Sequence, residues 1–491
     1  MTTSRQLEIS LAGGRSGSGP ATWGQRAIWD IVNRLAPGDR PRFNIATSAP
    51  IDPGLPLPVV LDALGHLLHL HDSLHTRLLP APDGAGVHQI VDPDGRLPVH
   101  VRDCPDGADR AELTAAGEAL HAELAARPFD VGAEWPIRVG LVVADGLVRQ
   151  MSLTLSHTAV DGTGMGLLVR DLSELALGAD PAAIRAARAP QQPLEEAGFQ
   201  TSPRGLKRDA NARAHALRKL RGAPARLFPP AVGKTGETGT AATEAGAERF
   251  PNAVLDSPAL LRAVDAVAAA HRTGTSAVLL AATAAMTARL SGSPDAVLQV
   301  VVNNRFLSGL SDAVSVVAGD ALLHLPNADV DTAPDTAPDS DDARDFGAAV
   351  RRTHAASIAA YRHAYFDRRL LDAEVARLTA EGVPLADRSC VFNDTRELLP
   401  AGLTGPADDA PATAPDGRTT LSWPVEFDPR PGLSYALDAL RTPDTLRLAM
   451  TADPSVLPRP AMERFLYGIE ELVLTEERTL NGLNGPNGLN G

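Results

Sequence analysis

From residue 22 to residue 177, segments with apolar residues at helical spacing alternate with segments with apolar residues at strand spacing. This pattern predicts a mixed α/β region. Thr22, followed three positions later by Gln25, is typical of the capping box that opens a helix. Asp145-Gly146 lies between two apolar runs and predicts a hairpin turn. Helices are predicted over residues 57–74, 111–126 and 164–177, and strands over residues 74–79, 87–91, 98–102, 137–143 and 147–155.

The second half continues this mixture after a change in composition. Residues 192–229 are polar and basic and are predicted to form one long helix, and the glycine-rich residues 230–246 a flexible linker. The repeated Asn-Gly tail from residue 480 cannot build a core, so we expect it to be disordered. Helices are predicted over residues 257–271, 275–290 and 462–474, strands over residues 296–302, 433–440 and 445–451, and loops over residues 327–345 and 402–416.

The chain of 491 residues is longer than an ordinary single domain, so several packing units are expected. The linker composition marks the boundary between two of them. We expect a monomer. The predicted parts are an N-terminal lobe over residues 1–190, a connecting basic helix and linker over 191–245, a C-terminal lobe over 246–478 and a disordered tail over 479–491.

The formal net charge of −14 makes nucleic acid an unfavourable partner, because phosphate contacts require clustered Lys and Arg. One dense basic stretch runs from Arg204 to Arg226 and includes Arg218, Lys219 and Arg221. A solvated helix face is the simpler explanation of this stretch. Docking of an acidic or phosphorylated partner is the alternative.

Cysteine content and hydropathy indicate a reducing, aqueous compartment. Cys104 and Cys390 are the only cysteines, too few for a disulfide framework and without the spacing of a zinc site. No apolar run reaches the roughly 18 residues of a membrane span, and the N-terminus lacks the apolar core of a signal peptide. We therefore expect a cytoplasmic protein that is not integral to a membrane and binds no metal.

The segment from Ser156 to Gly162 carries the strongest candidate chemistry. A predicted strand ends there, and His157, Asp161 and Gly162 lie in the loop that leads to the next helix. Such a loop, with a glycine to permit unusual backbone angles, can aim an imidazole into a cleft. Histidine, with an ordinary pKa of about 6.5, suits proton transfer near neutral pH. From these residues alone, a packed loop histidine with a structural role is the alternative.

Further segments accompany this one in a fixed order over nearly the whole chain. They are Thr22-Trp23-Gly24-Gln25 with Trp29, Leu74 to Leu78, Arg127 to Asp130, Trp135 to Arg138, Leu168 to Leu172, Leu279 to Leu290 and Val297 to Arg305. The series resembles the condensation domains of nonribosomal peptide synthetases, in the superfamily that includes chloramphenicol acetyltransferase and carnitine acyltransferases. In that family an HHxxxDG motif follows a PFD segment and precedes a helix with a DL pair.

The resemblance implies two α/β sandwich lobes of the chloramphenicol-acetyltransferase type, arranged as a V-shaped pseudo-dimer around a central tunnel. His157 would lie along that tunnel and accept or orient a proton while an amine or alcohol attacks an acyl or aminoacyl thioester, forming an amide or ester in natural-product biosynthesis. The thioester is expected as a substrate, on the phosphopantetheine of an acyl or peptidyl carrier protein or on coenzyme A, with no bound cofactor. No adenylation or carrier module is recognisable, so we expect a stand-alone enzyme that receives activated substrates.

This sequence departs from the family motif at its first position, where Ser156 replaces the first histidine, while the second is kept as His157. The resemblance implies that Asp161 is chiefly structural and pairs with Arg305. It also makes the N–H of Gly162 a candidate donor to an oxyanion. Residues 319–323 match the family's GxFxNT segment poorly, so no acceptor-site residue is assigned there. Donor docking is assigned to Arg218, Lys219 and Arg221.

Two rival functions share the fold. The loss of the first motif histidine weakly favours a non-catalytic recruitment module, and an epimerase would use His157 with a second base.

Three other motifs suggest sites that their surroundings do not support. The glycines of residues 162–166 suggest a dinucleotide-binding loop, but that loop needs a small residue where this chain has Leu167. The segment Gly13-Gly14-Arg15-Ser16 suggests a carrier-protein attachment site, but no helical bundle precedes it. The histidines His66, His69, His71 and His75 suggest a metal site, but they lack metal-site geometry.

Overall fold

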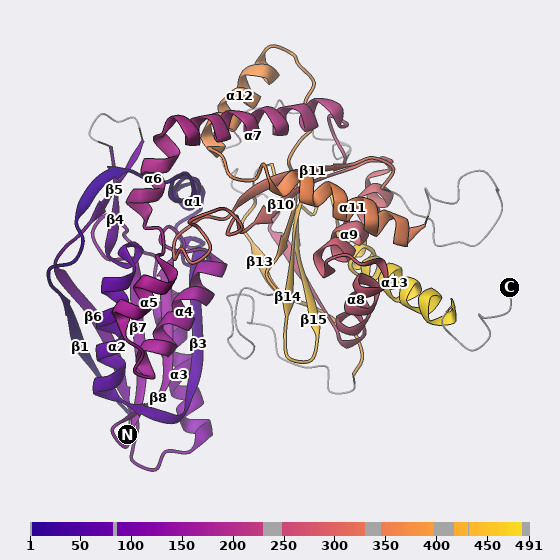
Figure 1. The fold of residues 1–491 in the computed structure, drawn as a ribbon. Helices are drawn as coiled ribbons and strands as arrows, with labels where there is room; N and C mark the ends of the chain where they lie inside the picture. Colours follow the sequence, from indigo (N-terminus) through magenta and orange to yellow (C-terminus); the bar gives the residue numbers. More distant parts are fainter. Residues whose placement is uncertain are drawn as a thin grey trace. The chain divides into compact units, whose positions relative to one another are not determined.

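The computed structural model describes residues 2–81, 86–228, 248–328, 345–396, 417–430 and 432–483 (Figure 1). The chain divides into two compact units. The first contains the described residues up to Arg208 and the later segment Asn303–Ala318; the second contains Asp209–Val302, Gly319–Arg396 and the described residues from 417 onward. The chain enters the second unit within helix α7 (Pro203–Gly222), and the return of Asn303–Ala318 to the first unit is not expected from the sequence.

A five-stranded sheet in the order β1-β6-β7-β8-β3 forms the centre of the first unit. Only β6 and β7 are parallel; the other neighbours are antiparallel. Alternate residues of β7 face opposite sides, because Gly140 packs against α3 while Val139 and Leu141 join the core formed with α2 and α4. The strands are β1 (Thr3–Leu11), β3 (Asn44–Pro56), β6 (Gly95–Asp103), β7 (Ile137–Ala144) and β8 (Leu147–Ser156), and the helices α2 (Leu57–Leu70), α3 (Arg110–Ala125) and α4 (Gly162–Ala176).

Smaller elements complete the first unit. A three-stranded antiparallel sheet has the order β2-β5-β4. Thr22 and Gln25 form the predicted capping box at the start of α1, and the predicted hairpin turn is confirmed by positive φ angles of 53° at Asp145 and 74° at Gly146. The bounds are β2 (Gly17–Pro20), β4 (Thr76–Pro80), β5 (Val87–Val91), α1 (Trp23–Arg34), α5 (Pro181–Arg188), α6 (Pro193–Thr201) and the short 3-10 helices η1 (Arg40–Phe43) and η2 (Asp72–His75).

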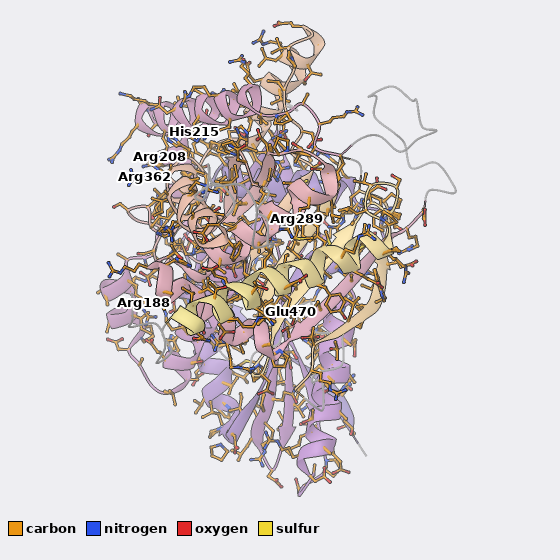
Figure 2. All side chains as sticks on the ribbon, turned by 90° about the vertical axis from the view of Figure 1, so that its right-hand side faces the viewer. Arg188, Arg208, His215, Arg289, Arg362 and Glu470 are labelled. Carbon is orange, nitrogen blue, oxygen red and sulfur yellow. The ribbon has the colours of Figure 1, made fainter. Side chains whose placement is uncertain are left out.

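The second unit is built on a seven-stranded sheet in the order β11-β10-β12-β14-β15-β9-β13. Helices α8, α9, α11 and α13 pack against one another and against the sheet, and α9 is buried over most of its length. Glu470 of α13 (Figure 2) accepts a hydrogen bond of 2.5 Å from Ser257, the N-cap of α8, and so links these two helices. Both units are mixed α/β, which confirms the predicted fold class.

The bounds in the second unit are as follows. The strands are β9 (Phe250–Ser257), β10 (Ala296–Val302), β11 (Gly319–Leu325), β12 (Cys390–Asp394), β13 (Thr420–Phe427), β14 (Tyr435–Arg441) and β15 (Leu446–Ala452), and the helices are α8 (Pro258–His271), α9 (Thr275–Ser291), α11 (Phe346–Tyr361), α12 (Arg368–Ala380) and α13 (Arg459–Leu483). No helix within the described ranges combines the length and apolar character needed to cross a bilayer.

Several predicted elements need correction. The single helix over residues 192–229 is wrong, because the chain breaks at Ser202 between α6 and α7, where Pro203 lacks the N–H that a continuous helix requires. A disordered tail from residue 479 is also wrong as far as Leu483, since α13 extends to that residue. All of the predicted linker 230–246, all of the predicted loop 402–416, residues 329–344 of the other predicted loop and the rest of the tail lie outside the described residues.

Candidate active site around His157

His157 is the first residue after β8 and lies partly exposed in the turn before α4. Its Nδ1 is 2.9 Å from the carbonyl oxygen of Val160, and its ring stacks on Phe43 with the ring centroids 5.8 Å apart. Because a carbonyl oxygen only accepts hydrogen bonds, Nδ1 carries the proton of the neutral ring and Nε2 keeps its lone pair. The turn therefore fixes the ring and leaves Nε2 as the proton-accepting atom.

Burial lowers the pKa of His157 below its ordinary value of 6.5, and the nearby charge of Asp161 and the bond to Val160 offset this only in part. If His157 is the general base, kcat/KM should be constant at neutral and alkaline pH and should fall as the pH drops through this lowered pKa, because the protonated ring cannot accept a proton. A pH–rate profile checks this prediction. An acidic limb centred above pH 6.5 would contradict it.

The carboxylate of Asp161 is 3% exposed and engages both of its oxygens in structural bonds. One oxygen caps α4 by accepting the N–H of Gly164 at 2.7 Å. The other accepts the guanidinium of Arg305 at 3.0 Å and the backbone N–H groups of Val317 and Ala318 at 3.0 and 2.9 Å. A second contact with Arg305, at 2.9 Å, completes the ion pair that the resemblance implies.

Arg305 extends this network into the chain that follows it. Its Nη2 donates to the carbonyl oxygens of Ala313 and Ser315 at 2.8 and 3.2 Å. The preceding residue, Asn304, has a φ of 55°, in the left-handed region that glycine adopts freely and asparagine tolerates better than most residues. Asparagine can therefore stand where the family's strand ends in Gly-Arg.

Two glycines allow Asn303–Ala318 to lie directly against the first unit's helices. A Cβ at Gly164 would lie 2.6 Å from Val160 Cγ2 and 3.1 Å from Arg305 Nη2. A Cβ at Gly24 of α1 would lie 2.0 Å from the carbonyl oxygen of Val316. The approaches of Gly164 to Arg305 and of Gly24 to Val316 give no local sequence signal, because each joins positions far apart in the chain.

Ser156, at the place of the first motif histidine, holds the turn together. It is 6% exposed, and its Oγ is 2.8 Å from the hydroxyl of Thr158 and accepts the N–H of Thr158 at 3.3 Å. Its own N–H donates to Pro136 O at 3.0 Å. These short-range bonds stabilise the backbone that carries His157.

Residues 127–130, which precede the motif, are fixed to the sheet by two buried side chains. Arg138 of β7 donates to two carbonyl oxygens of this segment at 2.7 and 2.8 Å, and its guanidinium lies 3.8 Å from the ring centroid of Phe129. Asn44 donates a third hydrogen bond to the segment, at 3.0 Å. Since Asn44 follows Phe43, the start of one strand holds both the segment and the ring that stacks on the candidate base.

Gly162 is the first residue of α4, and the N–H groups in the first turn of a helix have no acceptor within that helix. This position is compatible with oxyanion binding. The alternative of a dinucleotide-binding loop is not compatible with the structure, because residues 162–166 are already helical.

The four clustered histidines make separate contacts. His71 Nε2 is 3.0 Å from Asp171, and His75 Nδ1 is 2.7 Å from the carbonyl oxygen of Asp92, while His66 and His69 are exposed. Among the residues that the structure describes, no group of three His, Cys, Asp or Glu side chains has the arrangement of a metal site.

The three basic docking candidates lie in the last turns of α7, in the second unit, whereas His157 lies in the first. Arg218 and Arg221 are exposed. The charge of Arg221 acts on Glu374 of α12, while Arg218 and Lys219 act on His215. The three candidate side chains therefore act on different groups, Arg221 on Glu374 and the other two on His215.

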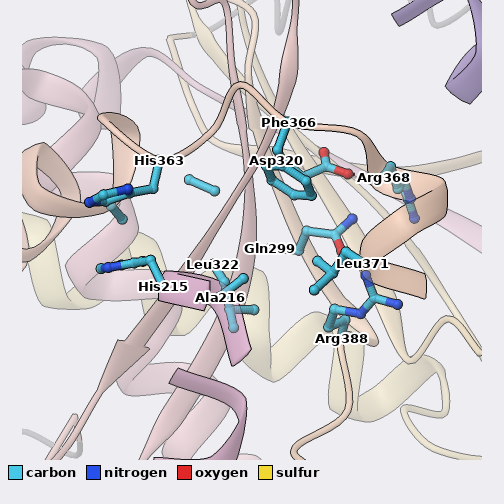
Figure 3. Close-up of a pocket in the computed structure, with 12 residues that line it drawn as sticks. His215, Ala216, Gln299, Asp320, Leu322, His363, Phe366, Arg368, Leu371 and Arg388 are labelled. Carbon is cyan, nitrogen blue, oxygen red and sulfur yellow. Dashed lines mark hydrogen bonds and ion pairs between the residues drawn. The ribbon is translucent and has the colours of Figure 1, made fainter. Parts of the chain in front are cut away.

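A small pocket in the second unit brings His215 of α7 and His363 face to face (Figure 3). The two rings are nearly parallel, at 12°, with centroids 4.1 Å apart. The pocket volume of about 20 Å³ suits a single water molecule. The pocket is therefore too small for an acyl donor or acceptor.

Burial, followed by the positive charge of His363, lowers the pKa of His215 to about 4. Because the folded-state pKa lies below the ordinary 6.5, the unfolded chain binds the extra proton first, so His215 should contribute stability above pH 6.5 that is lost as the pH falls toward 4. His215→Gln should therefore flatten this part of the stability profile in urea unfolding measurements. Identical profiles for the variant and the parent protein would contradict the assignment.

No protein-family model matches the chain. In sequence it is similar to phosphinothricin tripeptide synthetase PhsC of Streptomyces viridochromogenes, with 30% identity over 312 residues, which cover 62% of this chain and 27% of the synthetase. The chain thus matches only a fraction of that much longer relative.

Solved structures give a likeness over almost the whole chain. The condensation domain of monacolin K polyketide synthase MokA has a TM-score of 0.66 and 17% identity, covering 94% of this chain and 98% of the other. The starter condensation domain of rhizomide synthetase, solved with C8-CoA and Leu-SNAC, has a TM-score of 0.61 and 18% identity, covering 94% of each chain. At 17% and 18% sequence identity, these structural similarities are evidence for a shared fold alone.

Proposed function

We propose that this chain, which has the condensation-domain fold, is an acyltransferase that joins an acyl or aminoacyl thioester to an amine or alcohol. The observation that carries the proposal is the fixed, neutral imidazole of His157, whose Nδ1–H is held by Val160 and whose Nε2 can accept a proton. The likeness to condensation domains supports the choice of reaction class.

In the proposed reaction the acceptor nitrogen or oxygen attacks the thioester carbonyl while Nε2 of His157 takes its proton. The new C–N or C–O bond forms first, and the carbonyl oxygen becomes an oxyanion. When the oxyanion collapses, the C–S bond breaks and the sulfur leaves as a thiolate. The proton on His157 then passes to this sulfur, which returns the imidazole to its neutral state.

The chain's own residues contribute positioning and charge stabilisation to this step. The Gly162 N–H is the candidate donor to the oxyanion, because an N–H at the start of a helix adds the positive end of the helix dipole. Asp161 acts indirectly by holding the start of α4 and the chain around Arg305. Holding donor and acceptor together contributes through proximity, independently of the base.

A thioester is proposed as the donor in either of two carried forms, on phosphopantetheine or on coenzyme A. The rhizomide synthetase domain solved with C8-CoA and Leu-SNAC supports a binding site for such thioesters in this fold. The acceptor and the product bond, amide or ester, follow from the substrates that the test identifies.

The test is to incubate the full chain with panels of carrier proteins loaded with acyl or aminoacyl groups and with coenzyme A thioesters, in the presence of amines and alcohols. Intact mass spectrometry should show loss of the acyl group from the thioester and its appearance on the acceptor. Inversion at the α-carbon without transfer would identify an epimerase. Carrier binding without either reaction would identify a recruitment module.

A charge-reversal variant tests donor docking at α7. If an acidic carrier protein docks there, replacing Arg218, Lys219 and Arg221 by Glu should raise the apparent KM for the carried donor and reduce its salt dependence, with kcat nearly unchanged. A coenzyme A thioester is the control, because it presents the same acyl group without the surface of a carrier protein. An unchanged KM over a range of salt would assign these residues to a solvated helix face.

A further inference from the structure

A polar pocket of about 430 Å³ lies in the first unit, and none of the residues proposed for acyl transfer lines it. Along β6, Val99 and Val101 point into the core with α2, so Pro98 and His100 point to the opposite face of the sheet. The pocket lies where β6 and β7 begin and is lined from both faces of the sheet. Pro98 and His100 line it from this face, Leu97 and Ile137 from the other, and Arg127 lies just beyond the end of α3. Its volume is in the range of small-molecule sites, roughly 300 to 1,000 Å³.

One wall of the pocket is rigid. The indole N–H of Trp135 donates to Asp92 at 3.0 Å, and Arg77 holds the same carboxylate with two bonds of 2.8 Å. The indole lies directly on Gly95, where a Cβ would come within 2.4 Å of it. The wall therefore offers an apolar surface that is already in place before a ligand binds.

The charges around the pocket balance except at one position. Arg77 pairs with Asp92, Arg138 pairs with Glu134 at 2.9 Å, and Arg96 pairs with Glu8 at 2.8 Å. The guanidinium of Arg127 makes no hydrogen bond or ion pair with any residue that the structure describes, and the ring of His100 is likewise without a hydrogen-bond partner in those ranges. An unpaired guanidinium and an imidazole thus line the pocket together.

We propose that this pocket binds a small organic acid, with its carboxylate on Arg127 and His100 and its apolar body against Trp135. A guanidinium binds a carboxylate through two parallel hydrogen bonds, and a neutral imidazole adds one donor. One uncompensated cation fits one negative charge. The site is separate from the acyl-transfer centre, so the inference stands independently of the proposed reaction.

The experiment titrates the full chain with benzoate by calorimetry, with benzamide as the neutral isostere and inorganic phosphate as a bare anion. Benzoate should bind saturably, benzamide should bind at least about tenfold more weakly, and Arg127→Gln should weaken benzoate binding about tenfold. Arg5→Gln is the matched control. It removes a positive charge from β1, the strand that pairs with β6, but Arg5 pairs with Asp103 at 2.6 Å and does not line the pocket.

A second readout follows the His100 imidazole by NMR, with its signal identified among the 13 histidines by its loss in His100→Gln. Burial, and the nearby charge of Arg127, hold the pKa of His100 below its ordinary value. A bound carboxylate should raise this pKa, because a nearby negative charge favours the protonated ring. The proposal is overturned by non-saturable benzoate binding, by an unmoved His100 signal, by equal losses in Arg5→Gln and Arg127→Gln, or by tighter binding of phosphate than of benzoate.

Discussion

His157→Ala should reduce acyl transfer by about 10² to 10⁴-fold, or to background, while the protein remains folded. His157 is a half-buried turn residue, and its ring is held by a hydrogen bond to the carbonyl oxygen of Val160, so its removal costs little packing. Turnover with the identified donor and acceptor, together with urea unfolding, measures both parts of the prediction.

The matched control is His66→Ala, which removes an exposed histidine from α2 and should leave turnover unchanged. His157→Gln is a second useful variant, because it can keep a hydrogen bond to Val160 but cannot act as a base near neutral pH. Near-normal turnover in both His157 variants would remove the catalytic assignment. Carrier binding without turnover in the parent protein would then favour the recruitment-module alternative.

Asp161→Ala should destabilise the protein by about 3 to 5 kcal/mol and also reduce activity, because Arg305 would keep a buried charge without its partner. Arg305 is 8% exposed and Asp161 3%, so solvent cannot replace the lost carboxylate readily. The backbone N–H groups of Val317 and Ala318 would lose their acceptor at the same time. Urea unfolding of the variant, read as a free energy of unfolding, checks the size of the effect.

A double-mutant cycle separates the ion pair from the other bonds of Asp161. Arg305→Met alone should leave the carboxylate with its three backbone donors, and the double variant should be less destabilised than the sum of the single variants. If the losses in free energy of unfolding are additive, the 2.9 Å contact between Arg305 and Asp161 contributes no coupling energy. The destabilisation by Asp161→Ala would then come from the lost helix cap and backbone hydrogen bonds.

Local patterns predicted the elements around His157 well. The hairpin at Asp145-Gly146 was predictable because its turn needs two residues that tolerate positive φ, and the alternation on either side sets the strands. The pairing of Asp161 with Arg305 came only from the resemblance, since 144 positions separate them and no spacing rule connects them. The catalytic role of His157 also comes from the resemblance, and it stays a prediction.

Other features of the site had no signal in the sequence. Phe43, which stacks on His157, lies in a short 3-10 helix without a recognisable motif. The carbonyl and N–H groups of residues 313–318 that surround Arg305 and Asp161 are backbone atoms, which carry no residue-specific pattern. Pro203 marks the break in the sequence, but the polar composition on both sides favours one continuous helix.

The return of Asn303–Ala318 to the first unit has a consequence for how the protein is made. A ribosome synthesises the strands of the first sheet early, yet Asp161 gains Arg305 and its two backbone donors only after residue 318 has emerged. Until then the Asp161 carboxylate lacks its ion-pair partner and two of its backbone donors, which favours an incompletely folded intermediate over a finished domain. For the same reason, a recombinant fragment that stops at Arg208 lacks part of its own interior, and truncation experiments should retain the chain through Ala318.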